Sequence, residues 1–117
     1  MEVKDKISFS EYIDIEKKLD IRIGQIVAAE RIPKSSKLLK LTVIFGVEEE
    51  YEKTVVTNIG TTYAPDDLIG LTMPFIVNLE PVVMMGVTSE AMIVVGTGLE
   101  GQIQVGLDYV GIGTKLI

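Results

Sequence analysis

The feature that most constrains the fold is a succession of short segments in which apolar and polar residues alternate. A period of two residues is typical of a β-strand that buries one face. Glycine, proline and acidic residues lie between the segments, as expected for turns. The pattern predicts five strands, at Leu19–Arg31, Leu38–Phe45, Tyr51–Ile59, Leu71–Leu79 and Ala91–Val95.

The second strand has the clearest alternation, and two others carry an irregularity. In the first strand the apolar phase slips after Gly24, which suggests a bulge that bends a long strand around a barrel. The alternative is a plain strand that is apolar on both faces. Pro74 lacks an N–H group and predicts an edge or a bulge in the fourth strand. The apolar face of the second strand comprises Leu39, Leu41, Val43 and Phe45.

The connector between the third and fourth strands carries a helix signal. Pro65 suits a first helical turn, and Asp66 and Asp67 suit its positive dipole end. A short helix over Pro65–Ile69, stopped by Gly70, is predicted. Three strands, a short helix and two strands are the element order of the OB fold. The fold class is therefore all-β, a five-stranded OB-fold barrel with a short helix between strands 3 and 4.

The barrel is expected over residues 19–95, with an extension at each end. In the N-terminal lead-in, residues 1–18, Ser8 and Glu11 fit a capping box and predict a short helix around Ser10–Ile13; the alternative is a flexible segment. The C-terminal β extension, residues 96–117, predicts strands near Ile103–Val105 and Leu107–Val110. It is too apolar for a free tail, which favours either a cap on the barrel or a dimer contact.

Composition removes several function classes. The 117 residues include no Cys, His or Trp, which excludes disulfides, a thiolate zinc site and Ser-His or Cys-His catalysis. We expect a binding module with no cofactor and no metal, and an enzyme is a distant third hypothesis. No apolar run reaches the ~18 residues of a membrane helix, so we expect no membrane association and a cytoplasmic location.

Every Lys and Arg except Lys115 lies at or before Lys53. The net charge is −6, and no basic residue lies between Thr54 and Thr114. A polyanion would therefore meet the first half. In OB folds the loop between strands 1 and 2 contacts oligonucleotides. The alternative is a solvated loop. That loop and the start of strand 2 contain Arg31, Lys34, Ser35, Ser36, Lys37 and Lys40.

Residues 78–95 are interpreted as a shaped loop on the barrel rim. Asn78, like Asn58, ends a strand, where an asparagine caps a turn or reads a base edge. Met84 and Met85 give an adaptable apolar surface, because adjacent residues of a strand point to opposite faces and only one can fill the core. Core filling is the interpretation for Met92.

Several motifs in one order resemble the tRNA-binding domain of methionyl-tRNA synthetase. That domain occurs as a C-terminal domain or beta subunit, and as free-standing dimeric tRNA-binding proteins. The resemblance implies an OB fold, a homodimer and tRNA binding by shape, whereas one branch of the family is chaperone-like and binds peptides. The motifs are LDIRIGQI, IPKSSKLLKLTVIFG, VVTNIG, LIGLTMPFIVNLEP and MMGVTSEAMIV.

The resemblance assigns residues position by position. The loop after strand 1 keeps the family's Pro33, Lys37 and Leu38, and the Ser-x-x-Met pattern is kept in Ser89 and Met92. The rim keeps Asn78, Pro81, Met84 and Gly86 but has Glu80, Val82 and Val83 where the family has cations. Losing about three phosphate-facing cations lowers the salt dependence of RNA binding by roughly three units.

Two functions follow as expectations. The first is non-catalytic tRNA binding, either in support of an aminoacyl-tRNA synthetase or as part of one. The second is binding of unfolded peptides or a protein partner by the apolar rim at residues 82–85. The predicted tRNA-binding residues are Arg31, Lys34, Ser35, Ser36, Lys37, Lys40, Asn58, Asn78, Met84 and Ser89.

Overall fold

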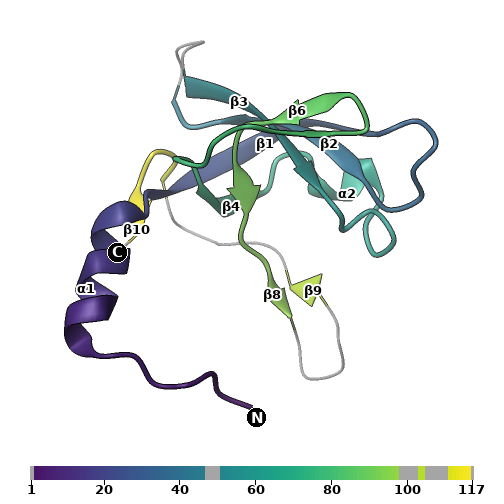
Figure 1. Cartoon of the computed structure of the whole chain (residues 1–117). Coiled ribbons are helices and arrows are strands. Elements are labelled where there is room, and N and C mark those ends of the chain that lie inside the picture. The colour runs from purple at the N-terminus through teal and green to yellow at the C-terminus, as the bar shows by residue number, and fades with distance from the viewer. Residues whose placement is uncertain (1, 47–50, 98–102, 105–110, 117) are drawn as a thin grey trace.

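The computed structural model describes residues 2–46, 51–97, 103–104 and 111–116. It is an all-β OB-like barrel with two helices (Figure 1). The helices are α1 (Phe9–Lys18) and α2 (Pro65–Leu68). The strands are β1 (Ile21–Arg31), β2 (Leu39–Ile44), β3 (Glu52–Thr57), β4 (Thr72–Ile76), β5 (Val82–Met84), β6 (Val87–Ser89), β7 (Met92–Ile93), β8 (Gly96–Thr97), β9 (Ile103–Gln104) and β10 (Lys115–Leu116).

The long strand β1 organises the main sheet, which has the order β3-β2-β1-β4-β7. Its first half, from Ile21 to Gln25, pairs antiparallel with β4, and its second half, from Gln25 to Arg31, pairs with β2. Gln25 belongs to both ladders. A strand that changes partner midway has to coil, which is how a small sheet curls into a barrel.

The bulge in β1 lies beyond the position predicted from the sequence. The register against β2 shifts between Ile26 and Ala28, which makes Val27 the extra residue, and its side chain is exposed. The prediction of a bulge at Gly24 is wrong. Gly24 pairs regularly with Met73, and a Cβ there would lie 2.6 Å from Val43 Cγ1 and 2.7 Å from Phe45 Cε1. Glycine is needed there because the core side chains approach the backbone closely.

Pro74 was expected at an edge or a bulge, and the structure places it in neither. Strand β4 lies between β1 and β7, and its register against β1 is continuous. Pro74 lies opposite Ile23, whose N–H donates to Thr114 O at 2.9 Å and whose carbonyl accepts from Gly113 N. Ile23 therefore makes its hydrogen bonds on its other side. The missing proline N–H has no role in this ladder.

The core lies inside the barrel and follows the predicted alternation. In β2 the side chains of Leu39, Leu41 and Val43 are fully buried, and Phe75 of β4 packs edge-on against Phe45 with ring centroids 5.6 Å apart. Leu68 of α2 is also fully buried and closes one end of the core. The short helix predicted at Pro65–Ile69 is confirmed, with Gly70 after it at φ +93°.

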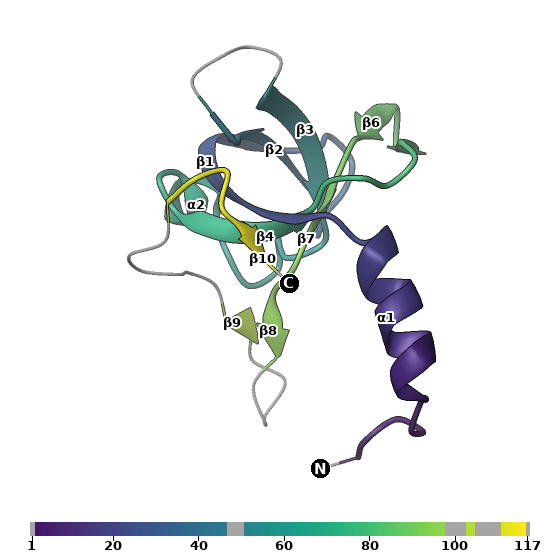
Figure 2. The ribbon, with the colours of Figure 1, turned by 90° about the vertical axis from the view of Figure 1, so that its left-hand side faces the viewer.

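The helix predicted at the N-terminus is confirmed with Ser8 as its N-cap, and it is longer than expected. The Glu11 N–H donates to Ser8 Oγ at 3.1 Å, and α1 continues to Lys18. None of its residues is buried. Figure 2 shows α1 extending away from the barrel.

The C-terminal extension supplies three short strands within the part described. Strand β8 pairs with β9, and β10 pairs with the start of β1. The predicted strand near Ile103–Val105 corresponds to β9, except for Val105, which lies outside the described residues. The strand predicted near Leu107–Val110 lies outside them entirely.

The side chains of Ser89, at the end of β6, and of Glu90, just after it, close the barrel against β3. The Val56 N–H donates to Ser89 Oγ at 3.0 Å, and the Ser89 hydroxyl donates to Ala91 O at 3.0 Å. Next to it, the Glu90 N–H donates to Thr54 O at 2.8 Å, and the Thr54 N–H donates to Glu90 Oε1 at 2.9 Å. Ser89 is 6% exposed. A hydroxyl and a carboxylate thus take the place of a regular ladder where the barrel closes.

Replacing Ser89 with alanine tests this closure. The variant leaves the Val56 N–H without its partner in a buried position, so we expect a loss of about 1–3 kcal/mol of unfolding free energy. Urea denaturation followed by circular dichroism measures it. Thr88→Ala, an exposed change on the same strand, is the control and should stay within about 0.5 kcal/mol of the parent. Equal stability of the two variants would contradict the closure.

Candidate nucleic-acid interface

The β1–β2 loop, residues 32–38, is held in one shape by its own hydrogen bonds. The Ile32 N–H donates to Leu38 O at 3.1 Å, and the Ser35 N–H donates to Ile32 O at 3.1 Å. Ser35 Oγ accepts from Leu38 N at 3.0 Å and from Lys37 N at 3.4 Å. Lys34 has φ +67°, a left-handed conformation within a tight turn. The serine predicted to bind phosphate is therefore part of the turn itself.

Arg31 and Gly60 fix this loop to the end of β3. Arg31 Nη1 donates to Gly60 O at 2.9 Å, and the Gly60 N–H donates to Lys37 O at 2.9 Å. A Cβ at position 60 would lie 2.8 Å from Lys37 O, so a larger residue would push the loop away. This arrangement sets Lys37 beside Asn58.

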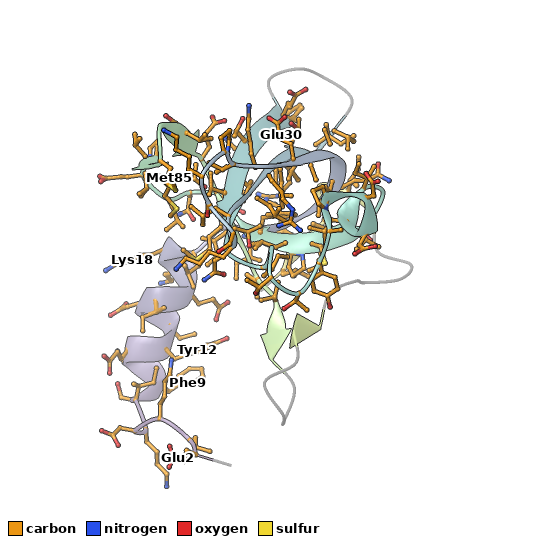
Figure 3. All side chains as sticks on the ribbon, turned by 90° about the vertical axis from the view of Figure 1, so that its right-hand side faces the viewer. Glu2, Phe9, Tyr12, Lys18, Glu30 and Met85 are labelled. Atoms are coloured by element: carbon orange, nitrogen blue, oxygen red, sulfur yellow. The ribbon has the colours of Figure 1, made fainter. Side chains whose placement is uncertain are left out.

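The predicted rim loop is a β-hairpin made of β5 and β6. Met84 pairs with Val87, and Met85 and Gly86 form a two-residue turn with φ +48° and +81°. Positive φ at both positions is the type I′ geometry that matches the twist of a hairpin. Figure 3 shows Met85 at the outer side of the barrel, pointing away from it. Val82, Val83 and Met85 are 52%, 67% and 55% exposed.

A groove of about 390 Å³ lies between the start of β2, the end of β3, β5 and the segment that contains β7. Figure 1 shows the β1–β2 loop and the β5–β6 hairpin at the same end of the barrel. Most of the lining is apolar, and its polar side chains are Lys37, Asn58 and Thr57, of which Thr57 is buried. The groove is lined by Lys37, Leu38, Val56, Thr57, Asn58, Ile59, Met84, Met92, Ile93 and Val95.

A smaller hollow of about 50 Å³ shares Val56, Met84 and Met92 with the groove. It continues the apolar surface towards Leu79 and Val82, and Glu80 lies at its edge. The two hollows together form a shallow surface with cations on one side and an acid on the other. We call the two hollows and the β1–β2 loop the groove face.

The basic residues of the loop differ in whether their charged group already has a partner within the protein. Residues 31–46 contain four cations and no acid. Lys40 Nζ lies 3.5 Å from Glu30 Oε1 of the facing strand, and Arg31 donates to a backbone carbonyl. Lys34 and Lys37 are exposed, and within the described residues neither has an ion pair. These two ammonium groups are the ones best placed to meet phosphates.

Asn78 has a structural position and does not line the groove. Its Oδ1 accepts from Asp20 N at 2.9 Å, and its Nδ2 donates to Lys18 O at 2.6 Å. The side chain therefore joins the end of α1 and the residue before β1 to the chain that follows β4. Both ends of the amide are used, which matches the capping interpretation of an asparagine at a strand end.

The ten predicted residues separate into four groups. Lys37, Asn58 and Met84 line the groove, and Lys34 and Ser36 are exposed on the adjoining loop. Lys40 is paired across the strands. The remaining four make internal hydrogen bonds that shape the groove face or the barrel: Arg31, Ser35, Asn78 and Ser89.

Met92 was interpreted as a core residue, and this is wrong. It is 52% exposed and lies in the groove. The signal was present in the alternation, because Ala91 is buried and a neighbour in a strand points to the opposite face. The Ser-x-x-Met match also singled out this residue.

Within the described residues no helix has the length and apolar content needed to cross a membrane. The same part of the chain contains no group of three or more acidic residues arranged to hold a metal ion.

A family model described as "Putative tRNA binding domain" matches residues 21–108. The chain therefore belongs to the tRNA-binding domain family. It is 38% identical over 100 residues to a methionine–tRNA ligase of Flavobacterium johnsoniae and 44% identical over 95 residues to that of Methanocaldococcus jannaschii. These alignments cover 86% and 80% of this chain but 13% and 14% of the ligases.

Two solved structures match almost the whole chain. One is a MetRS-related protein from Pyrococcus horikoshii, with a TM-score of 0.80, 31% identity and full coverage of both chains. The other is the chaperone CsaA from Bacillus anthracis, with a TM-score of 0.75, 28% identity, and coverage of 97% of this chain and 100% of that one. These likenesses confirm the predicted family and the OB-like barrel.

Proposed function

We propose that this chain binds tRNA without catalysing a reaction, and that the groove face is the binding surface. The observation that carries the proposal is the position of Lys37 and Asn58 on an apolar groove, next to an exposed Lys34, in a chain of the tRNA-binding domain family. The lysines contact phosphates, and the groove accepts an unstacked base or a sugar edge. A cytoplasmic location and support of a methionyl-tRNA synthetase, in cis or in trans, belong to the same proposal.

The electrostatics predict binding that is weak for this kind of protein. Each phosphate contact adds close to one unit to the salt dependence of the binding constant. With Lys34 and Lys37 as the lysines without an ion pair among the described residues of the groove face, and Glu80 at its far edge, shape and apolar contact contribute a large share of the affinity. The loop hydrogen bonds hold Lys37 in place before binding, which reduces the entropy lost on association.

Removing the Lys37 charge tests the proposed surface. For Lys37→Gln we expect weaker tRNA binding at low salt and a salt slope smaller by about one unit. Fluorescence anisotropy with labelled bulk tRNA at several salt concentrations measures both. Lys115→Gln, which removes an exposed charge on β10 away from the groove, is the control and should leave affinity and slope close to the parent. Unchanged binding in Lys37→Gln would count against the proposal.

Adding cations to the β5–β6 hairpin tests whether bound RNA contacts this hairpin. Val82 and Val83 are exposed, so Val82→Arg/Val83→Lys should fold normally. We expect tighter tRNA binding and a salt slope larger by about two units. The matched control is Val3→Lys/Ile7→Lys, which adds the same charge at exposed positions before α1. Equal gains in tRNA affinity for the two variants would show a general charge effect and would mean that the hairpin does not contact the RNA.

The exposed apolar rim supports a second candidate function, which is peptide or protein binding. Val82, Val83 and Met85 form an exposed apolar surface on a rigid hairpin, and a chaperone is among the structural neighbours. Binding of unfolded peptides that is insensitive to salt and lost in Met84→Ser/Met85→Ser would favour this function. tRNA binding that falls steeply with salt would favour the first.

We also propose a homodimer, because apolar side chains remain exposed on α1. Phe9, Tyr12 and Ile15 lie at a spacing of three residues and are 78%, 41% and 43% exposed. Together with the apolar extension they offer a surface for a second copy, which would double the number of cations available to one tRNA. Light scattering should give a molar mass twice 12.8 kDa at micromolar concentration. A mass of one chain at tens of micromolar would refute the dimer.

A further inference from the structure

The end of the barrel opposite the groove face contains charged residues at positions that point inwards. Arg22 lies directly opposite Phe75 on β4, and Lys53 lies directly opposite Val43 on β2. Residues directly opposite each other in an antiparallel pair share one face of the sheet. Phe75 and Val43 are fully buried, so Arg22 and Lys53 occupy the core-facing side. A stability argument alone would place apolar residues there.

These side chains surround a pocket of about 340 Å³. This is the size of a small-molecule site. Its aromatic residues are Phe45, which packs edge-on against Phe75, and Tyr51, which is 49% exposed. Gly24 lies beneath Phe45, and a Cβ there would lie within 3 Å of the phenyl ring. The pocket is lined by Asp20, Arg22, Phe45, Tyr51, Lys53 and Val77, with Gly113 at its edge.

Among the described residues that line the pocket, Arg22, Lys53 and Asp20 leave one excess positive charge. Arg22 donates to Asp20, with Nε 2.6 Å from Oδ1 and Nη2 3.4 Å from Oδ2. That hydrogen bond raises the pKa of the guanidinium. Lys53 has no ion pair with any described residue. Glu52 and Glu90 line an adjoining hollow with Lys53, and the Glu90 carboxylate accepts from the Thr54 N–H.

We propose that this pocket binds a small monoanion with an aromatic body, an aromatic carboxylate. The carboxylate accepts from the Lys53 ammonium, and Arg22 Nη1, which has no hydrogen bond within the described residues, lies in the same pocket. The aromatic body lies against Phe45 and Tyr51. A single charge is favoured because, among the described lining residues, Lys53 is the cation without an ion pair, and Asp20 repels a second negative charge. In a chain of net charge −6, an unpaired cation beside two rings selects this chemistry.

The probe is 2-naphthoate, and the neutral 2-naphthamide has the same shape. Titration followed by amide NMR should show naphthoate shifting the signals of Tyr51, Lys53, Val77 and Gly113. Isothermal calorimetry should show naphthamide, which lacks the charge, binding at least about fivefold more weakly. 2-Naphthyl phosphate, a dianion, should also bind more weakly than naphthoate. Equal affinity for naphthoate and naphthamide, or shifts that map to the groove face, would overturn the proposal.

Lys53→Met removes the charge and keeps the length of the side chain. We expect about a tenfold loss of naphthoate affinity, with naphthamide affinity unchanged. Lys37→Met on the groove face is the control and should bind naphthoate as the parent does. Circular dichroism checks that Lys53→Met is folded, and Lys53→Gln serves in its place if it is not. Parent-like naphthoate binding in a folded Lys53 variant would refute the site. Saturating naphthoate should leave tRNA affinity unchanged, so the two proposals can fail separately.

Discussion

The pairing of β1 with a different strand along each half is the constraint on which the structure depends. Its first half pairs with β4 and its second half with β2, and Gln25 serves both ladders. Such a strand has to coil, and the extra residue Val27 and the close packing at Gly24 accommodate the curvature. Once β1 is coiled, β3 approaches β6 and β7 closely enough for Ser89 and Glu90 to close the barrel with side chains.

The coiled sheet leaves two open ends, and they have different chemistry. At one end the β1–β2 loop and the β5–β6 hairpin enclose an apolar groove with Lys37 and Asn58 at its edge. At the other end Arg22, Asp20 and Lys53 face inwards around two aromatic rings. Small barrels bind ligands at their mouths, where the alternation that fills the core stops. The hydrogen bonds of Ser35 and Arg31 preorganise the first end, and the Arg22–Asp20 ion pair orders the second.

Sequence reasoning located β1 to β4, β7 and α2 because alternation and turn chemistry are local properties, whereas the hairpin of β5 and β6 was expected to be a loop. The same reasoning found the basic loop and, through the resemblance, the family. It placed the bulge of β1 at Gly24 and expected Pro74 at an edge or a bulge, and both predictions were wrong. The reason is that the direction of a residue's backbone hydrogen bonds depends on which strand lies next to it. The roles of Ser89 and Asn78 were hidden for a similar reason. Ser89 bonds to Val56, and Asn78 bonds to Lys18 and Asp20, partners distant in sequence.

The sequence by itself determined the order of the barrel elements along the chain, the buried face of β2 and the placement of every basic residue except Lys115 at or before Lys53. Period-two alternation and composition can be identified in the sequence without knowing which strands pair with each other. Only the tertiary structure decided which polar side chains remain available to a ligand. In the sequence the four cations of the loop cannot be told apart. In the structure Arg31 donates to Gly60 O and Lys40 pairs with Glu30, which leaves Lys34 and Lys37. Lys53 likewise faces the barrel interior because antiparallel pairing with β2 places it beside Val43.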